Sequence, residues 1–542
     1  MGAAEVRHRE AAGRRYRDEW RCRLHRARRA CARLRRDGDR GWQRRLLPRH
    51  AQDRHRGAAP GLPRGGHRDA GGRGLRGVTI RPAGEARFGA CVPVVVVGAG
   101  AAGLVAALSA QEAGADVLLL ERDAVPRGST ALSAGLIPAA GTRWQRAAGV
   151  EDTPEDFAAD IMAKAADEPD RALVALLTTH ITPTLEWLHE AHGLGFSLVT
   201  DFRYPGHSAL RMHGLPSRSG EALVDALRSA AEAAGIPLLC ETQVDCLFAA
   251  ADGRIAGIGL HRPDGSREEI GCDALVLACN GYGGNRELVA EHIPAMADAL
   301  YFGHPGNQGD ALLWGQALGA ATRHLSGHQG HGSVAQPHGI LITWATITEG
   351  GVQVNAEGRR FSNEAHGYSE QAAVVLRQSG GVAWTIFDGR IAGIARQFED
   401  FRKAEEGGAI LRADTPEALA LRLGIPTEAL VATLAEVAAL KQAGGTDGFG
   451  RRFVDIPQLA APYCAVRVTG ALFHTQGGLV VDDAARVLCP DGSALPNLYA
   501  AGGAACGVSG AGPAGYLSGN GLLAAIALGR VAGQAAGHQV CR

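Results

Sequence analysis

The pattern of apolar and polar positions predicts strands and helices that alternate along most of the chain. Val94–Val97 is an uninterrupted β-branched run, which is typical of a strand buried on both faces of a parallel sheet. The Ala/Leu-rich stretch 104–113 predicts a helix after it, and 116–120 predicts a second strand. Further helices are expected within 154–192 and at 221–234 and 522–532, and further strands at 238–244, 254–260, 274–278 and 498–501. This alternation indicates an α/β fold with a doubly wound, Rossmann-like sheet.

The first strand leads directly into a glycine-rich turn, Gly98–Gly103. Gly98 permits a tight turn, Gly100 lets the backbone approach a pyrophosphate, and Gly103 lets helix and strand pack closely. Glu121, at the end of the second strand, can accept hydrogen bonds from both ribose hydroxyls of an adenosine. A glycine cluster alone is a weak signal. Strand, helix, second strand and acid in register predict a dinucleotide site.

Small-residue segments recur after this unit and at later strand ends. They lie at 127–135, 279–285, 477–478, 502–503 and 507–521. Such segments are used where the backbone must lie against a flat ring or a phosphate, so we expect one cofactor to be contacted at several points. Between about 322 and 473 the composition changes, with more Trp, His and Gln. We interpret this part as an inserted second domain, and substrate sites favour such interfaces.

The charge is unevenly distributed, although the formal net charge is zero. The first 90 residues contain 25 arginines, no lysine and nine acidic residues, without a sustained apolar period. One interpretation is an RNA-binding or transit segment. A misassigned translation start in a GC-rich reading frame fits the composition better. We therefore expect residues 1–87 to be disordered or mis-translated and unrelated to function, with ordered structure from about Phe88.

The eleven cysteines are scattered and form no CxxC pair. This spacing predicts no haem attachment, iron–sulfur cluster, metal site or disulfide framework, and reduced thiols are typical of a cytoplasmic protein. No apolar stretch is long enough for a transmembrane segment. The expected partner is a small-molecule substrate, with no nucleic acid.

Five motifs, taken in order, resemble the flavoprotein family of fumarate reductases and succinate dehydrogenases, which includes 3-ketosteroid dehydrogenases. They are Gly98–Gly103, Leu275–Gly284, Asn355–Glu364, His474–Gly478 and Leu498–Gly502, and the resemblance covers about residues 90–540. It implies FAD, a doubly wound FAD-binding domain and an inserted α+β capping domain. The domain limits that follow are 1–87 for the Arg-rich segment, 88–321 and 473–542 for the two parts of the FAD-binding domain, and 322–472 for the capping domain.

The resemblance also indicates which residues contact FAD. In members with covalent flavin a histidine in the loop after the first unit carries it, and here that position is Ser129, so we expect noncovalent FAD. The predicted cofactor-binding residues are Gly98, Ala99, Gly100, Ala102, Gly103, Glu121, Arg122, Ser129, Thr130, Ser133, Ala134, Gly135, Val244, Ala278, Cys279, Asn280, Gly281, Gly502, Gly503, Asn520 and Leu522.

Two arginines of the fumarate reductases have no counterpart in this alignment of motifs. Ile347 takes the position of the proton-donating arginine, and Tyr516 that of an arginine that holds a substrate carboxylate. Fumarate and succinate are dianions, and binding one in a pocket without water and without these cations costs several kcal/mol. Neither is therefore the expected substrate. Tyr368, after the Asn355–Glu364 motif, is similar in position to a catalytic tyrosine of ketosteroid dehydrogenases. Their keto-binding Tyr-Pro-Gly-Pro-Gly is only loosely matched by Gly510–Tyr516.

The predicted catalytic residues are Tyr368, His474 and Tyr516. One phenol would move a proton at the carbon next to a carbonyl and the other would donate to the carbonyl oxygen, although a buried tyrosine is as often structural. His474 lies where the family has a substrate-binding histidine. His331 is a weaker candidate, and Ser509 and Ser518 are further hydroxyl donors no stronger than residues that pack a loop.

The sequence therefore predicts a noncovalent FAD-dependent oxidoreductase that interconverts C–C and C=C bonds beside a carbonyl, dehydrogenating a neutral, apolar, 3-ketosteroid-like ketone. A reductase of an α,β-unsaturated carboxylate stays open, with His474, Arg203, Arg211 and Arg218 as its anion site. So does a non-catalytic flavin-binding protein, whereas a plain NAD-dependent dehydrogenase leaves the later glycine segments unexplained. Only one dinucleotide unit is present, so the electron partner is expected to be a quinone, a carrier protein or O₂.

Overall fold

The computed structural model describes residues 79–200 and 202–542. The predicted Arg-rich segment lies outside the described residues except for 79–87. Within that short stretch, β1 (Thr79–Pro82) pairs in parallel with β8 (Gln243–Ala249). The sheet of the FAD-binding domain therefore begins before the expected boundary at residue 88.

A nine-stranded sheet forms the centre of the FAD-binding domain. Its parallel part has the order β21–β10–β2–β3–β7, and β2 lies between β10 and β3. Val94–Val97 of β2 are buried, because helices and neighbouring strands cover both faces. The other strands of this sheet are β2 (Ala90–Val97), β3 (Val117–Leu120), β7 (Leu238–Leu239), β9 (Ile255–His261), β10 (Arg267–Leu277), β20 (Arg486–Leu488) and β21 (Ala494–Ala500).

One predicted strand is divided in the structure. The stretch 238–244 forms β7 and the start of β8, because Glu241 has a positive φ of 52° and turns the chain between them. β7 pairs with β3, whereas β8 pairs with β9. A turn at 263–265 joins the antiparallel strands β9 and β10.

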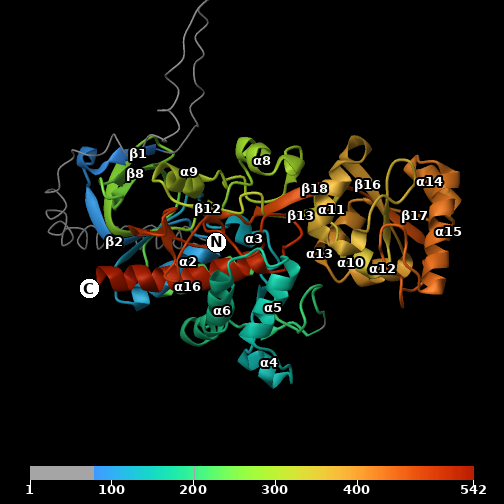
Figure 1. The fold of residues 1–542 in the computed structure, drawn as a ribbon, viewed down its shortest axis with the longest axis horizontal. Helices are drawn as coiled ribbons and strands as arrows, with labels where there is room; N and C mark the ends of the chain where they lie inside the picture. The colour runs from blue at the N-terminus through green and yellow to red at the C-terminus, as the bar shows by residue number, and fades with distance from the viewer. Residues whose placement is uncertain (1–78, 201) are drawn as a thin grey trace, which may run out of the picture.

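Two helices lie against this sheet and pack backbone to backbone against each other, α2 (Ala101–Glu112) and α16 (Asn520–Val540). Gly529, Gly533 and Gly537 of α16 follow at four-residue spacing and face α2. A Cβ atom on Gly533 would lie 2.2 Å from the Ala106 carbonyl oxygen, so only glycine permits this approach. Figure 1 shows α16 running along the sheet beside α2.

The remaining elements of this part of the molecule are short helices and small sheets. The predicted loop 127–135 contains one of them, α3. The helices are α3 (Gly128–Ala131), α4 (Arg143–Ala147), α5 (Pro154–Lys164), α6 (Arg171–His192), α7 (Gly220–Ala233), α8 (Arg286–His292) and α9 (Asp310–Ala317). The strands are β4 (Ile137–Pro138), β5 (Ser197–Leu198), β6 (Met212–Gly214), β12 (Thr322–Arg323) and β19 (Gly478–Leu479), and the 3₁₀ helices of the described chain are η3 (Ala83–Glu85), η4 (Pro294–Met296), η5 (Glu364–His366), η6 (Ser379–Gly381) and η7 (Gly502–Ala504).

The capping domain is built on a second, seven-stranded sheet. Figure 1 shows its helices gathered at one end of the molecule, with β13 and β18 extending back toward the FAD-binding domain. The strands are β11 (Leu300–Tyr301), β13 (His328–Ala335), β14 (Ile340–Leu341), β15 (Val352–Val354), β16 (Val382–Asp388), β17 (Ile410–Ala413) and β18 (Tyr463–Thr475). The helices are α10 (Ala345–Thr348), α11 (Tyr368–Leu376), α12 (Gly389–Ala395), α13 (Glu399–Glu406), α14 (Pro416–Leu423) and α15 (Thr427–Ala443). The predicted FAD-binding fold with an inserted α+β capping domain is confirmed.

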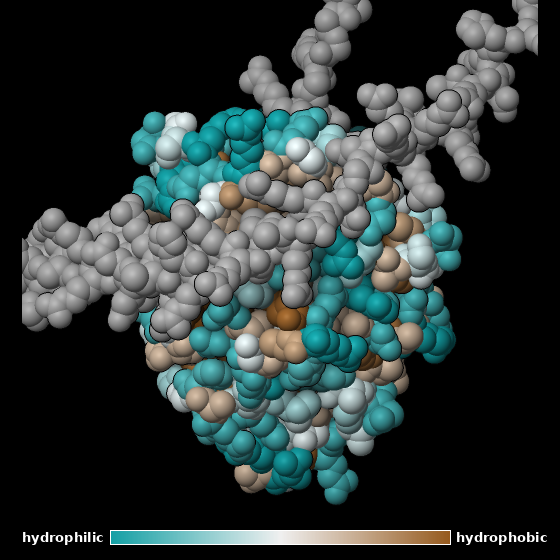
Figure 2. Space-filling model, turned by 90° about the vertical axis from the view of Figure 1, so that its left-hand side faces the viewer, coloured by the Kyte–Doolittle hydropathy of each residue, from teal (hydrophilic) through white to brown (hydrophobic). Residues whose placement is uncertain are grey.

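Hydrophilic residues predominate on the visible part of the face drawn in Figure 2, with hydrophobic residues scattered among them. In the described part of the chain, none of the helices combines the length and the apolar character needed to cross a bilayer.

Candidate active site

One cavity of about 910 Å³ is lined by both domains. The FAD-binding domain contributes the ends of its parallel strands and the turns that follow them. The capping domain contributes side chains from β13, β18, α10 and α11. Because the carboxyl ends of parallel strands are where open α/β sheets bind ligands, this cavity is the expected place for both cofactor and substrate.

The predicted dinucleotide turn has the geometry that its glycines require. Gly98 has a φ of 102°, and a Cβ atom there would lie 2.5 Å from the Ala278 carbonyl oxygen. A Cβ atom on Gly103 would lie 1.8 Å from the Gly98 carbonyl oxygen. The Glu121 carboxylate accepts hydrogen bonds from the Ala99 N–H at 2.9 Å and the Asp123 N–H at 3.0 Å. Glu121 therefore holds the turn in shape as well as lining the cavity.

Most predicted cofactor-binding residues line the cavity: Gly98, Gly100, Ala102, Glu121, Arg122, Ser129, Thr130, Ser133, Ala134, Val244, Ala278, Cys279, Asn280, Gly502, Gly503 and Leu522. They come from segments far apart in the sequence, and small residues let these segments meet. A Cβ atom on Gly503, for example, would lie 2.0 Å from Asn280 Oδ1. Ser129 Oγ accepts a hydrogen bond of 2.8 Å from Asn307 Nδ2, which ties this loop to the turn at 304–307.

Five predicted cofactor-binding residues do not line the cavity: Ala99, Gly103, Gly135, Gly281 and Asn520. Three of these are glycines packed against protein backbone or side chains, as Gly135 is against the Ser219 carbonyl oxygen at 2.6 Å from an added Cβ. Asn520 is fully buried and donates to Ser509 Oγ at 3.0 Å. Direct contact with FAD by these five side chains stays a prediction.

The donor groups of the cavity fit FAD. The N-termini of α2 and α16 both lie at the cavity, and neither Gly100 nor Gly519 at their N-caps provides a side-chain cap. Thr130 Oγ1 accepts the Ala101 N–H at 3.2 Å, and the Tyr516 oxygen accepts from Gly519 and Gly521. The remaining backbone N–H groups of the two first turns, with the partial positive charge of each helix end, face the cavity and suit an anion or an oxygen-rich ring edge. The α2 terminus would hold the pyrophosphate, and the α16 terminus the oxygen-bearing edge of the flavin ring.

Tyr368 lies at the start of α11, in the cavity wall formed by the capping domain. Its hydroxyl is 2.9 Å from Ser518 Oγ, and its ring stacks on His331 with ring centroids 5.0 Å apart. Burial raises the pKa of Tyr368 well above its ordinary value, the nearby Tyr516 adds to the rise, and the hydrogen bond with Ser518 opposes it. Tyr368 is therefore a neutral hydroxyl with a second hydroxyl as its partner.

Tyr516 lines the cavity beside Tyr368, with ring centroids 6.4 Å apart. Burial raises the pKa of Tyr516 to about 12, and hydrogen bonds from the backbone N–H groups of Gly521 and Gly519 oppose that rise. Since the phenol oxygen accepts from the start of α16, its own proton is available for a substrate oxygen.

His331 and His474 come from the paired strands β13 and β18 and line the cavity with Tyr368 and Tyr516. We call these four side chains the catalytic wall, after the roles predicted for them. Burial lowers the pKa of His331 to about 3 and that of His474 to about 4. Both imidazoles are therefore neutral at pH 7, when each carries one N–H donor. His331 also stacks on Phe473 with ring centroids 5.4 Å apart, so aromatic rings and neutral donors surround the catalytic part of the cavity.

Four buried histidines predict a loss of stability in mild acid. Burial lowers the pKa of His207 and His213 to about 4, as it does for His331 and His474. Below the ordinary value of 6.5 the unfolded chain binds more protons at these positions than the folded chain. The free energy of unfolding should therefore fall from pH 6.5 toward 4, by up to about 1.4 kcal/mol per pH unit for each histidine.

Urea unfolding of FAD-saturated protein at pH 7.5, 6.0 and 5.0 checks this expectation. The variant His213→Gln should show a shallower pH dependence, because it removes one titrating group away from the cavity. Equal free energies of unfolding at pH 7.5 and 5.0 would contradict the low pKa values.

The three arginines considered as an anion site have different surroundings. The Arg211 guanidinium is fully buried and pairs with Asp152 at 2.7 Å and with Asp160, so its charge is already neutralised. Arg203 donates to the Ser208 carbonyl oxygen at 3.2 Å and does not line the cavity. Arg218 lines the cavity next to Ser219, whose backbone packs against the predicted FAD loop at Gly135.

Ile347 does not line the cavity, contrary to the position that the motif alignment assigned to it. It is buried in α10, and its carbonyl oxygen accepts a hydrogen bond of 3.1 Å from Arg451 Nη2. Tyr368, from α11 of the capping domain, lines the cavity instead. Sequence reasoning also missed Trp344, Phe473 and the mouth residues Phe202 and Phe398, which line the cavity but belong to no motif.

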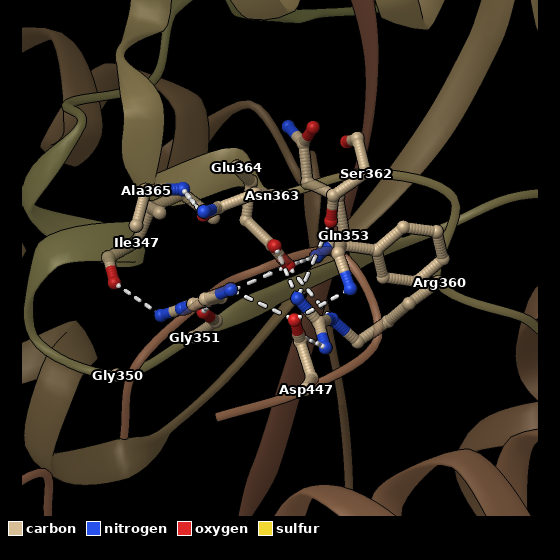
Figure 3. A network of polar contacts seen from close by, with 12 residues as sticks. Ile347, Gly350, Gly351, Gln353, Arg360, Ser362, Asn363, Glu364, Ala365 and Asp447 are labelled. Atoms are coloured by element: carbon tan, nitrogen blue, oxygen red, sulfur yellow. Dashed lines mark hydrogen bonds and ion pairs between the residues drawn. The ribbon is translucent and has the colours of Figure 1, made fainter. Parts of the chain in front are cut away.

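A buried ionic network holds the segment that precedes Tyr368. Glu364 of η5 pairs with Arg360 at 2.6 Å and with Arg451 at 3.1 Å, and Arg360 also pairs with Asp447. The side chains of all four residues are at most 7% exposed. Glu364 also accepts the Gln353 N–H at 3.0 Å, as Figure 3 shows. The motif Asn355–Glu364 thus anchors α11 to the capping domain and does not itself line the cavity.

Comparison with known proteins agrees with this geometry. The family described as "FAD binding domain" matches residues 93–522. The probable fumarate reductase Ifc3 of Shewanella frigidimarina is 32% identical over 444 residues, which are 81% of this chain and 74% of that protein. A structure of the open conformation of a flavocytochrome c3 fumarate reductase has a TM-score of 0.72 at 31% identity, covering 84% of this chain and 79% of that one.

A structure of 3-ketosteroid-Δ4-(5α)-dehydrogenase from Rhodococcus jostii RHA1, in complex with 4-androstene-3,17-dione, is also similar. Its TM-score is 0.68 at 25% identity, and the match covers 85% of this chain and 100% of that one. Both fumarate reductases and a ketosteroid dehydrogenase are thus similar to this chain. The chain belongs to the FAD-binding-domain family, within the fumarate reductase and succinate dehydrogenase flavoprotein superfamily, and is an FAD-dependent oxidoreductase acting on C–C and C=C bonds.

Proposed function

We propose that this oxidoreductase dehydrogenates a neutral, largely apolar ketone at the C–C bond next to its carbonyl, with FAD bound noncovalently. The observation that supports the proposal is the neutral catalytic wall. Tyr368, Tyr516, His331 and His474 are all neutral at pH 7, and Phe473 and Trp344 pack around His331. A carboxylate held by these four side chains alone would lose hydration without gaining a cation, whereas a carbonyl oxygen needs only donors.

The tyrosines would divide the chemistry between them. One C–H bond breaks at the carbon next to the carbonyl. The Tyr368 hydroxyl would take that proton as it passes its own to Ser518 Oγ at 2.9 Å, and water at the open side of the cavity would receive the proton that leaves. A hydride leaves the adjacent carbon and the C=C bond forms. When bound, FAD supplies the acceptor for that hydride. Tyr516 and His474 would donate to the carbonyl oxygen, where negative charge develops as the proton leaves.

A second candidate is reduction of an α,β-unsaturated carboxylate. The identity to a probable fumarate reductase favours it, as do the two histidines at the catalytic wall. In that reaction the proton and hydride would move in the opposite direction, and His331 and His474 would hold the carboxylate as neutral donors. Arg211 argues against this candidate, because its buried ion pairs with Asp152 and Asp160 leave it no charge to offer a substrate carboxylate.

Anaerobic flavin spectroscopy with matched probes separates these candidates. We expect 4-androstene-3,17-dione or cyclohexanone to bleach the oxidised flavin, with dichlorophenolindophenol restoring turnover in place of the unknown quinone, carrier protein or O₂. Fumarate and urocanate should fail to reoxidise flavin that has been reduced with dithionite. Reoxidation by either acid would instead support the second candidate, and no response to any probe would reject dehydrogenation of these ketones.

Heating the same sample tests how FAD is held. Denaturation and ultrafiltration should release all of the flavin as FAD, because Ser129 has no ring nitrogen to bond to it. Flavin that stays with the denatured protein would contradict noncovalent binding.

A further inference from the structure

A chain of hydrogen bonds connects His474 with Asn520, the first residue of α16. His474 Nδ1 lies 2.7 Å from Gln476 Nε2. Gln476 Oε1 accepts a hydrogen bond of 2.8 Å from Ser509 Oγ, and Ser509 Oγ accepts one of 3.0 Å from Asn520 Nδ2. Gln476, Ser509 and Asn520 are all buried, so water does not compete for these bonds.

The direction of each bond follows from the donors available. The amide nitrogen of Asn520 can only donate, so it uses a lone pair of Ser509 and leaves the serine proton for Gln476 Oε1. The carboxamide of Gln476 then presents its NH₂ group to His474. A neutral imidazole that accepts at Nδ1 carries its proton on Nε2.

The orientation of His474 places that proton near the reacting groups. An added Cβ atom on Gly521 would lie 3.7 Å from His474 Nε2 and 3.9 Å from the Tyr516 hydroxyl oxygen. His474 Nε2 and the Tyr516 hydroxyl therefore both lie near the start of α16, where both residues line the cavity. An Nε2–H group there would join the Tyr516 hydroxyl as a second donor.

We propose that Gln476, Ser509 and Asn520 are positioning residues that fix His474 as the Nε2–H tautomer and so keep a second hydrogen-bond donor at the catalytic wall. The inference rests on the proposed function only in assigning a substrate carbonyl oxygen as the acceptor. It also gives Asn520 a role through Ser509, consistent with its absence from the cavity lining.

The tautomer of His474 is measurable without any substrate. FAD-loaded protein with ¹⁵N-labelled histidine would be examined at pH 7.5 by long-range ¹H–¹⁵N correlation, with the His474 signals assigned by their loss in His474→Asn. We expect the wild-type His474 to show the neutral Nε2–H pattern. An Nδ1–H pattern in the wild-type protein would overturn the proposal outright.

Substitutions then test whether Gln476 sets the tautomer. In Gln476→Glu both carboxylate oxygens can only accept, one from Ser509 Oγ and the other from His474. The His474 signals should therefore change to the Nδ1–H pattern or to imidazolium. Ser509→Ala should give a mixture of tautomers, since it releases the orientation of the Gln476 amide. Unchanged His474 signals in Gln476→Glu would overturn the role of Gln476, provided that its flavin spectrum shows bound FAD.

The control is Gln539→Glu, which makes the same chemical change on α16 while keeping an acceptor for the Tyr499 hydroxyl, away from the cavity. It should leave the His474 signals unaltered. If Gln476→Glu does not bind FAD, Gln476→Met replaces it and should give a mixture of tautomers, with an unchanged Nε2–H pattern counting against the proposal.

A kinetic measurement separates the positioning role of Gln476, Ser509 and Asn520 from the proposed function. With 4-androstene-3,17-dione or cyclohexanone as probe, flavin reduction in Gln476→Glu should be slower by about tenfold or more, the size of effect known for losing the partner that orients a metal-ligating histidine. Wild-type protein that oxidises neither ketone would reject the proposed function. The tautomer measurement would still decide whether Gln476, Ser509 and Asn520 position His474.

Discussion

Replacing Tyr368 by phenylalanine is expected to slow flavin reduction by the ketone probe by about 10²- to 10⁴-fold. The substitution removes the hydroxyl that would carry the proton, and with it the hydrogen bond to Ser518 Oγ. The phenyl ring keeps the stack on His331 and the edge contact with Trp344. FAD content and thermal stability should therefore stay close to those of the wild-type protein.

Stopped-flow absorbance of the oxidised flavin gives the rate of this step directly. Tyr499→Phe is the matched control, because Tyr499 is also a buried, hydrogen-bonded tyrosine but does not line the cavity. Ser518→Ala should have a smaller effect than Tyr368→Phe, since it removes only the second proton carrier. A Tyr368→Phe rate equal to that of wild type would remove Tyr368 from the mechanism.

Replacing Glu364 by glutamine should destabilise the protein by about 3–5 kcal/mol. Glu364 is the shared partner of Arg360 and Arg451, and all three side chains are almost fully buried. Without this carboxylate, two guanidinium groups compete for Asp447 in a region with little water. A buried charge that loses its partner costs far more than an exposed one, because desolvation is no longer offset.

Urea unfolding with a fixed excess of FAD measures this loss. Glu190→Gln serves as a control, since Glu190 pairs with Arg143 at the surface and exposed pairs contribute little. Its free energy of unfolding should match that of the wild-type protein. A Glu364→Gln protein as stable as wild type would mean that the network shown in Figure 3 does not support the capping domain.

The FAD-binding fold could be predicted because its signals are local. The strand, the glycine turn, α2 and Glu121 lie within residues 90–121, and each follows from steric or periodic rules that act over a few residues. The divided strand at 238–244 could not be predicted in the same way, since Glu241 adopts a positive φ that its residue type does not favour. β1 escaped prediction because the composition before it indicated no order.

The catalytic wall depended on contacts between distant segments. Tyr368 and Ser518 are 150 residues apart in the sequence, and only the packing of the capping domain against α16 brings their hydroxyls together. Arg211 is an instructive case, because its residue type predicted an anion site equally well. The structure surrounds its guanidinium with Asp152 and Asp160, so its charge serves the fold.

The sequence by itself determined the dinucleotide turn, the main alternation of strands and helices in the FAD-binding domain, without β1 and the divided strand, and the presence of an inserted domain. Backbone sterics and hydrophobic periodicity decide those features within short windows. Only the tertiary structure decided which polar groups are free for chemistry. Burial makes His331 and His474 neutral, hydrogen bonds connect Gln476 to Asn520, and ion pairs neutralise Arg211. Protonation and pairing depend on every neighbour in space, so residue type and spacing alone do not specify them.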